Sequence, residues 1–282
     1  MWILLASITG MTAMAGTLSK GTHSVYSGVS YGTWSSFESK GDEKSLPQNA
    51  MVTQILSRTQ YTYGIHDRFD LSIVLPVYSV SVSELSGNMF ETTTGLGQTG
   101  IGSNIGLFEQ NSLQITGAVG VYTGAFHAEN RGRLTNIGDG STQLRAGVSA
   151  SQLWEVNSGY VNINAKGGYI FKIPSTLDFD PKYPADDVTY GLSVGGGYKG
   201  YTASVFIDGF QRLNGVDYPA TSVDALDAFT ALKASQLKVG LSDSITVSDW
   251  TVSGYVASSV MARNNPTDEL IGGIGIGYLV QP

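Results

Sequence analysis

The residues that most often carry chemistry in proteins are scarce in this sequence. There is no Cys, and the three His residues are His23, His66 and His127. A nucleophilic site would need a Ser with a His within hydrogen-bond reach, and no His falls in the middle of an expected strand. Three scattered His residues without Cys are also a poor basis for a zinc site. We therefore predict neither an enzyme nor a metal site.

Two glycine-rich stretches resemble phosphate-binding loops in composition only. Residues 195–197 are three consecutive glycines, and Gly272 and Gly273 form a pair. Both stretches fall inside expected strands, whereas a phosphate loop joins a strand to a helix. Glycines inside a strand more often permit curvature. No cofactor is predicted.

Polar side chains alternate with apolar ones along residues 159–173, where Asn162, Asn164 and Lys166 are each flanked by apolar residues or Gly. Successive side chains of a strand point to opposite faces. In a soluble sandwich the apolar face would bury a core. In an outer-membrane barrel the apolar face meets lipid and the polar face lines the lumen. One strand does not decide between these two interpretations.

The same alternation assigns nine polar side chains to the inside of a barrel. These candidates for lining the lumen are Arg58, Gln60, Asp70, Arg145, Asn162, Asn164, Lys166, Asp208 and Lys238. The four cations among them would favour anions in a pore. The alternative is internal pairing with Asp70 and Asp208, because a buried charge is costly unless it is paired.

The composition fits a membrane barrel better than a soluble enzyme. Charged residues make up 14% of the 282 residues, against roughly 25% in soluble domains. The mean hydropathy is near neutral, which excludes a bundle of membrane helices but not a barrel, since alternation hides its apolar face. The net charge of −7 argues against nucleic acid as a partner.

Twelve stretches are expected to be strands, most of them longer than an ordinary strand. They cover residues 23–35, 50–65, 68–82, 98–109, 112–123, 140–154, 159–173, 186–199, 201–212, 233–243, 248–262 and 269–280. The connections alternate between short and long. The short ones fall at 65–68, 109–111, 155–158, 199–200 and 244–247, and the long ones at 37–49, 83–97, 124–139, 174–185, 213–232 and 263–268. Short periplasmic turns and long outer loops are typical of bacterial outer-membrane barrels.

We therefore predict an all-β protein: a transmembrane up-and-down antiparallel β-barrel of about 12 strands, formed by residues 16–282 as a single domain. Residues 1–15 form a short apolar run that ends in Ala13-Met14-Ala15, which predicts a signal peptide. Aromatic residues near strand ends or on outward faces are expected to form interfacial girdles. They are Tyr26, Tyr31, Trp34, Tyr61, Tyr63, Tyr169, Tyr190, Trp250 and Tyr278.

Four segments resemble one family of outer-membrane proteins. They are residues 63–76 (YGIHDRFDLSIVLP), 95–102 (GLGQTGIG), 138–147 (GDGSTQLRAG) and 159–171 (GYVNINAKGGYIF). The family is labelled as the meta-pathway of phenol degradation and is similar in architecture to transporters of hydrophobic compounds. Gln98 stands where the family usually has an acid. The resemblance implies a transport-type barrel for small aromatic or hydrophobic compounds.

The predicted function is an outer-membrane channel or transporter for the uptake of small molecules. Its expected partners are outer-membrane lipid, the barrel-assembly machinery and a small-molecule cargo. One alternative is a non-conducting structural or surface-interaction barrel whose loops at 124–139 and 213–232 bind a partner. A soluble secreted sandwich is a further alternative, and it would be distinguished by solubility without detergent.

Overall fold

The computed structural model describes residues 17–39, 42–46, 50–84, 89–123, 141–173, 186–213, 234–263 and 265–281. Nearly all of this part of the chain is strand. The strands are β1 (His23–Trp34), β2 (Ser36–Ser39), β3 (Asp42–Ser45), β4 (Ala50–His66), β5 (Phe69–Glu84), β6 (Met89–Leu96), β7 (Thr99–Gln110), β8 (Leu113–Thr123), β9 (Thr142–Val156), β10 (Gly159–Ile173), β11 (Asp187–Tyr198), β12 (Tyr201–Arg212), β13 (Ser235–Val247), β14 (Trp250–Arg263) and β15 (Leu270–Val280). No helix in the described ranges is long and apolar enough to cross a membrane.

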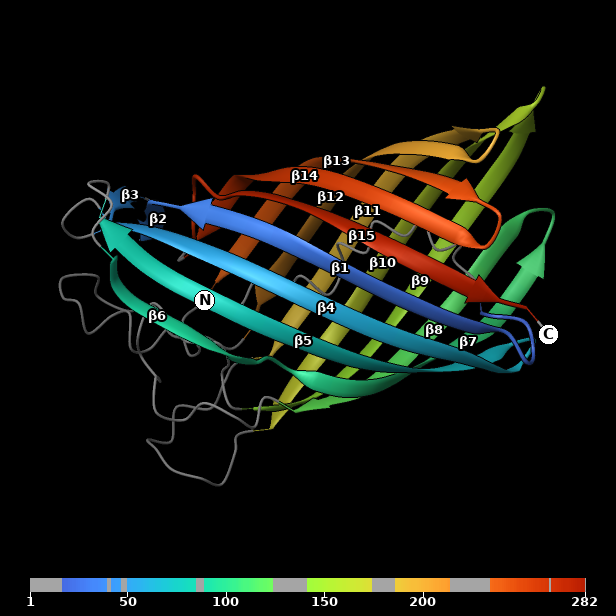
Figure 1. Ribbon diagram of the computed structural model, residues 1–282, viewed down its shortest axis with the longest axis horizontal. Coiled ribbons are helices and arrows are strands. Elements are labelled where there is room, and N and C mark those ends of the chain that lie inside the picture. Colours follow the sequence, from blue (N-terminus) through green and yellow to red (C-terminus); the bar gives the residue numbers. More distant parts are fainter. Residues whose placement is uncertain are drawn as a thin grey trace.

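The main sheet closes on itself. From β7 to β15 each strand pairs antiparallel with the next one in the sequence, β15 pairs with β1, β1 with β4, and β4 with β5. Because β6 and β7 follow one another along the same edge of β5, they fill one position, and the barrel has twelve. Figure 1 shows the strands tilted around a common axis. The predicted twelve-stranded antiparallel barrel is confirmed.

Three connections differ from the sequence-based expectation by more than two residues. Part of the connection predicted at 83–97 is strand, because β6 pairs with residues 77–83 of β5. β6 and β7 are separated at Gly97 and Gln98, where the Gly97 amide donates to the Pro76 carbonyl at 2.9 Å. Likewise, β2 and β3 pair within the connection predicted at 37–49, and β13 continues through the turn predicted at 244–247.

The two faces of the strands differ clearly in how exposed their side chains are. On β10, Val161, Ile163 and Phe171 are 41%, 37% and 46% exposed, whereas Ile170 and Lys172, on the other face, are buried. The apolar face therefore points outward along the strand. This orientation suits a surrounding lipid phase and is opposite to that of a soluble sandwich, whose apolar faces meet in a core.

Short turns gather at one end of the barrel, which Figure 1 shows beside the C-terminus. Both residues of the Asn111-Ser112 turn and both residues of the Lys199-Gly200 turn have positive φ. Two such residues are typical of the type I′ turn, which joins adjacent antiparallel strands most tightly. Short turns are periplasmic in bacterial outer-membrane barrels, so we infer that this end faces the periplasm.

Two residues expected in the aromatic girdle lie inside the barrel instead. Trp34 is 2% exposed and packs against Val52 and Val80, and the hydroxyl of Tyr26 lies against Gly28 and against Gly275 of β15. The prediction is wrong for these two, because the alternation along β1, and not nearness to a strand end, decides which face a side chain occupies. Most of the other predicted girdle residues are exposed: Tyr31, Tyr61, Tyr63, Tyr169, Tyr190 and Trp250. The ring centroids of Tyr278 and Trp250 lie 4.4 Å apart.

Candidate lumen site

All nine predicted lumen residues lie on the face opposite the exposed apolar side chains. Their positions follow the alternation of β4 (Arg58, Gln60), β5 (Asp70), β9 (Arg145), β10 (Asn162, Asn164, Lys166), β12 (Asp208) and β13 (Lys238). Whether these residues act on a cargo stays a prediction. The contacts that they form divide them into three groups.

Two of the cations form ion pairs. Lys166 Nζ lies 2.8 Å from Asp208 Oδ1, and the pair crosses Gly191 of the intervening strand β11. Lys238 Nζ lies 2.7 Å from Glu269 Oε2. Pairing with Asp208 is one of the sequence-based alternatives, whereas Glu269 is not among the predicted lumen residues. Both pairs neutralise charge on the inner face of the barrel wall.

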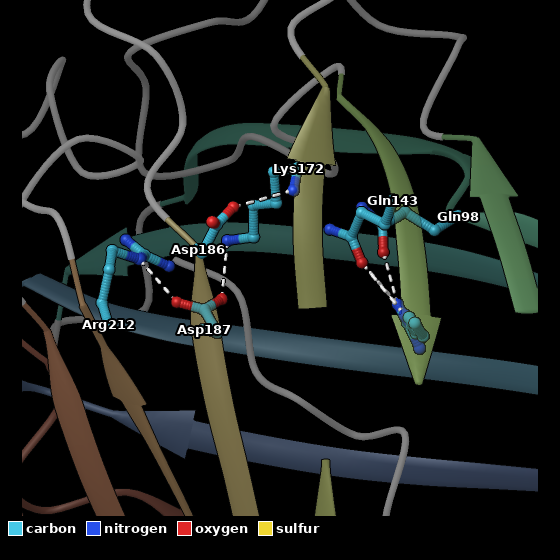
Figure 2. A network of polar contacts seen from close by, with 7 residues as sticks. Gln98, Gln143, Lys172, Asp186, Asp187 and Arg212 are labelled. Atoms are coloured by element: carbon cyan, nitrogen blue, oxygen red, sulfur yellow. Dashed lines mark hydrogen bonds and ion pairs between the residues drawn. The ribbon is translucent and has the colours of Figure 1, made fainter. Parts of the chain in front are cut away.

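A charged cluster outside the predicted set was missed from the sequence. Asp187 of β11 accepts from Arg212 Nε at 2.9 Å, and its other oxygen lies 2.6 Å from Lys172 Nζ. These three side chains are 1%, 3% and 1% exposed. Figure 2 shows the carboxylate between the two cations. The alternation along each strand puts all three residues on the inner face, and this is the signal that could have found the triad. Strand pairing places Asp187 opposite Arg212.

Asp70 binds the start of the described chain, and it pairs with no cation among the described residues. Its carboxylate accepts from the backbone amide of Leu18 at 3.2 Å and from the side chain of Asn104 at 2.9 Å. The predicted alternative in which Asp70 pairs with a lumen cation is therefore wrong, because its lone pairs are directed to these amides. Residues before 17, including the predicted signal peptide at 1–15, lie outside the described residues.

Arg58 and Arg145 form the third group, in which amides and rings surround the guanidinium groups. Arg145 donates to Gln98 Oε1 at 2.7 Å and to Gln143 Oε1 at 2.8 Å, and it stacks over the ring of Tyr122 at 4.0 Å. Figure 2 shows both Gln side chains beside the charged triad. Arg58 donates to Gln60 Oε1 at 2.9 Å. Within the described chain Arg58 forms no ion pair, and its buried Nε has no hydrogen-bond partner.

Inward tyrosines are the feature that sequence reasoning overlooked most. Five of them lie against glycines of the inner wall: Tyr26 against Gly28 and Gly275, Tyr78 against Gly97, Tyr122 against Gly100 and Gly120, Tyr160 against Gly197, and Tyr255 against Gly273. A Cβ at any of these glycines would fall within 2.9 Å of the ring or its hydroxyl. The signal was available, since each of these tyrosines has inward parity.

An apolar patch continues this inner lining. Leu56 of β4, Phe206 of β12, Ala257 of β14 and Ile271 of β15 form one buried cluster, and Tyr78 and Tyr255 pack against it. Phe206 reaches its partners across Gly240 of β13. One side of the inner wall is therefore apolar and aromatic.

The inner face around β10 and β11 leaves part of the lumen unfilled. Lys166 lies near the middle of β10 on the inner face, yet 36% of its side chain is exposed. Its neighbours Asn162 and Asn164 are also half-buried rather than buried. Small inward residues, such as Ser193 and Gly195 of β11, explain this, because they do not fill the lumen.

No catalytic or metal-binding arrangement emerges from the described residues. No group of three or more His, Asp or Glu side chains is placed to hold a metal ion in that part of the chain. His23 lies beside the hydroxyl of Tyr61 at 2.6 Å, and His66 is exposed at the short turn before β5. His127 lies outside the described residues. The loop at 124–139 and nearly all of that at 213–232 lie outside them too.

Solved structures match this arrangement. The structure described as the COG4313 outer membrane channel from Pseudomonas putida F1 aligns with a TM-score of 0.68 and 14% identity, over 95% of this chain and 98% of that one. The transport unit of the autotransporter AIDA-I from Escherichia coli aligns with a TM-score of 0.52, 12% identity and 90% coverage of each chain. The β domain of the Bordetella autotransporter BrkA aligns with a TM-score of 0.51 and 7% identity, over 92% of this chain and 99% of that one.

The chain has the outer-membrane β-barrel fold. These likenesses are below the identity at which activity can be carried over, so they show the fold alone. No family model matches the chain. No curated protein matches it either. The resemblance to the phenol meta-pathway family therefore stays a prediction.

Proposed function

We propose that this protein is an outer-membrane channel that takes up small molecules, with aromatic or hydrophobic compounds among its cargo. The proposed process is passage through the lumen, with no covalent step. The partners implied are the lipid around the barrel, the assembly machinery that inserts it and the cargo itself.

The exposure of Lys166 inside the wall is the observation that carries this proposal. A side chain in the middle of an inner face keeps 36% of its surface accessible only where the lumen around it is not filled. Twelve strands also give a barrel wider than the eight-stranded kind that side chains fill. The inward tyrosines and the apolar patch around Leu56 and Phe206 support aromatic or hydrophobic cargo, because flat rings offer apolar contact and a polar hydroxyl together.

Cysteine accessibility tests the proposal directly, since the chain contains no Cys. Asn164→Cys places a thiol on the inner face, and Ala165→Cys places one on the outer face of the same strand, as a matched control. Each full-length variant is refolded in detergent and inserted into a planar bilayer, and its single-channel current is recorded before and after a charged, water-soluble thiol reagent is added.

We expect a stable current from both variants, and a stepwise fall in current after modification of Asn164→Cys only. The reagent should reach the inner thiol through water, whereas the outer thiol faces lipid. A folded barrel that carries no current would refute the open channel. So would a current that modification of Asn164→Cys leaves unchanged.

A further inference from the structure

Arg58 differs from four other cations of the inner wall, which are paired with carboxylates. Lys166, Lys172, Lys238 and Arg212 each lie within 3 Å of a carboxylate oxygen. Arg58 forms no ion pair within the described residues, and its buried Nε has no hydrogen-bond partner. An uncompensated buried charge is costly, so Arg58 is placed to gain from an anion that the chain itself does not supply.

A second guanidinium group lies farther along the same inner wall. Strand pairing places Arg58 opposite Pro76, two residues before Tyr78, and places Gly120, two residues before Tyr122, opposite Arg145. The guanidinium group of Arg145 lies over the ring of Tyr122, 4.0 Å from its centroid. The side-chain contacts of Arg145 include two Gln amide oxygens, which orient the guanidinium group. Two guanidinium groups and two inward tyrosines therefore lie along one stretch of the inner wall.

The apolar patch adjoins this cationic pair through one residue. Tyr78 packs with its ring against the cluster of Leu56, Phe206 and Ile271. The inner wall thus changes from apolar to cationic across a single side chain. A molecule that matched both parts would have a flat apolar body and an anionic group at one end.

We propose that Arg58 and Arg145, together with Tyr78 and Tyr122, form a binding site for small aromatic carboxylates inside the lumen. The carboxylate accepts from the guanidinium groups, which suit its planar geometry, and the ring lies against the tyrosines and the apolar patch. This proposal rests on the proposed channel function, because the ligand reaches the site through the lumen. It narrows the cargo from small molecules in general to aromatic acids.

Equilibrium binding to the full-length refolded barrel in detergent tests the site without requiring transport. Benzoate is the probe, and acetate and benzyl alcohol are its controls, because acetate keeps the charge without the ring and benzyl alcohol keeps the ring without the charge. Binding is measured by titration calorimetry. We expect benzoate to bind at least about tenfold more tightly than either control, since both the charged hydrogen bonds and the ring contacts are required.

Three substitutions locate the binding. Arg58→Gln should weaken benzoate binding by about tenfold or more, the usual effect of losing a hydrogen bond to a charged group. Gln98→Glu, a nearly isosteric change, adds a carboxylate beside Arg145 and should weaken binding to a similar extent by competing with the ligand. Arg68→Gln changes an exposed Arg in the turn before β5 and should leave binding unchanged.

The outcomes separate this inference from the proposed function. If benzyl alcohol or acetate binds as tightly as benzoate, or if neither Arg58→Gln nor Gln98→Glu weakens benzoate binding, the aromatic-acid site is wrong even when Asn164→Cys reports an open channel. If benzoate binds as expected but the barrel carries no current, the site stands and the channel proposal fails. Gln98→Glu keeps the test decisive if Arg58→Gln does not fold.

Discussion

Asp187→Asn should destabilise the barrel strongly, because it removes the only carboxylate charge from the buried triad of Asp187, Lys172 and Arg212. The Asp187 carboxylate is 1% exposed and is shared by Lys172 at 2.6 Å and Arg212 at 2.9 Å. Removing one partner of a buried ion pair typically costs about 3 to 5 kcal/mol. Lys172 and Arg212 each have a further contact, so we expect a loss near the lower end, about 3 kcal/mol.

The free energy of unfolding can be measured by urea titration in lipid vesicles, followed by the fluorescence of the four Trp residues. Asp243→Asn is the matched control, because Asp243 is exposed on β13, and surface changes of this kind usually stay within about 0.5 kcal/mol. The double variant Asp187→Asn/Arg212→Gln should recover part of the loss, since it removes one of the two cations that the carboxylate balances.

The reasoning would be refuted by two results. A loss for Asp187→Asn as small as that for Asp243→Asn would mean that the triad contributes no net stability. A double variant whose loss equals the sum of the two single losses would mean that Asp187 and Arg212 do not interact energetically.

Two further predictions follow from single contacts. Gly191→Ala should separate the Lys166–Asp208 pair, because the new Cβ would lie 2.3 Å from Asp208 Oδ1; the reversal potential in a salt gradient should then change, while Gly167→Ala, whose Cβ meets nothing closer than 3.9 Å, should not move it. Burial alone would raise the pKa of Asp268, but the hydrogen bonds that it accepts from Ser35 and the following residue hold that pKa below its usual 3.8. A lowered pKa gives stability that is present above pH 3.8 and is lost as the pH falls through the folded value, so the difference in urea stability between wild type and Asp268→Asn should be present at pH 7 and disappear in stronger acid; a difference that persists there would contradict this assignment.

The alternation of side chains made most of the fold predictable. Along β10, for example, Asn162, Asn164 and Lys166 fall on one face because successive residues of any strand point to opposite sides. That rule is local, so it needs no knowledge of neighbouring strands. It also places Tyr26 and Trp34 inside, where the expectation of an aromatic girdle misassigned them.

The sequence by itself determined twelve of the strands, their order around the barrel, and which of their side chains face inward. Only the tertiary structure decided which inward charges meet. Lys166 reaches Asp208 across an intervening strand, and Lys238 reaches Glu269 rather than an acid of the predicted set, whereas Arg58 meets no acid in the described chain. The physical reason is that these contacts depend on the register between strands and on closure of the sheet. Both are set by the whole ring of pairings, and neither can be read from a single strand.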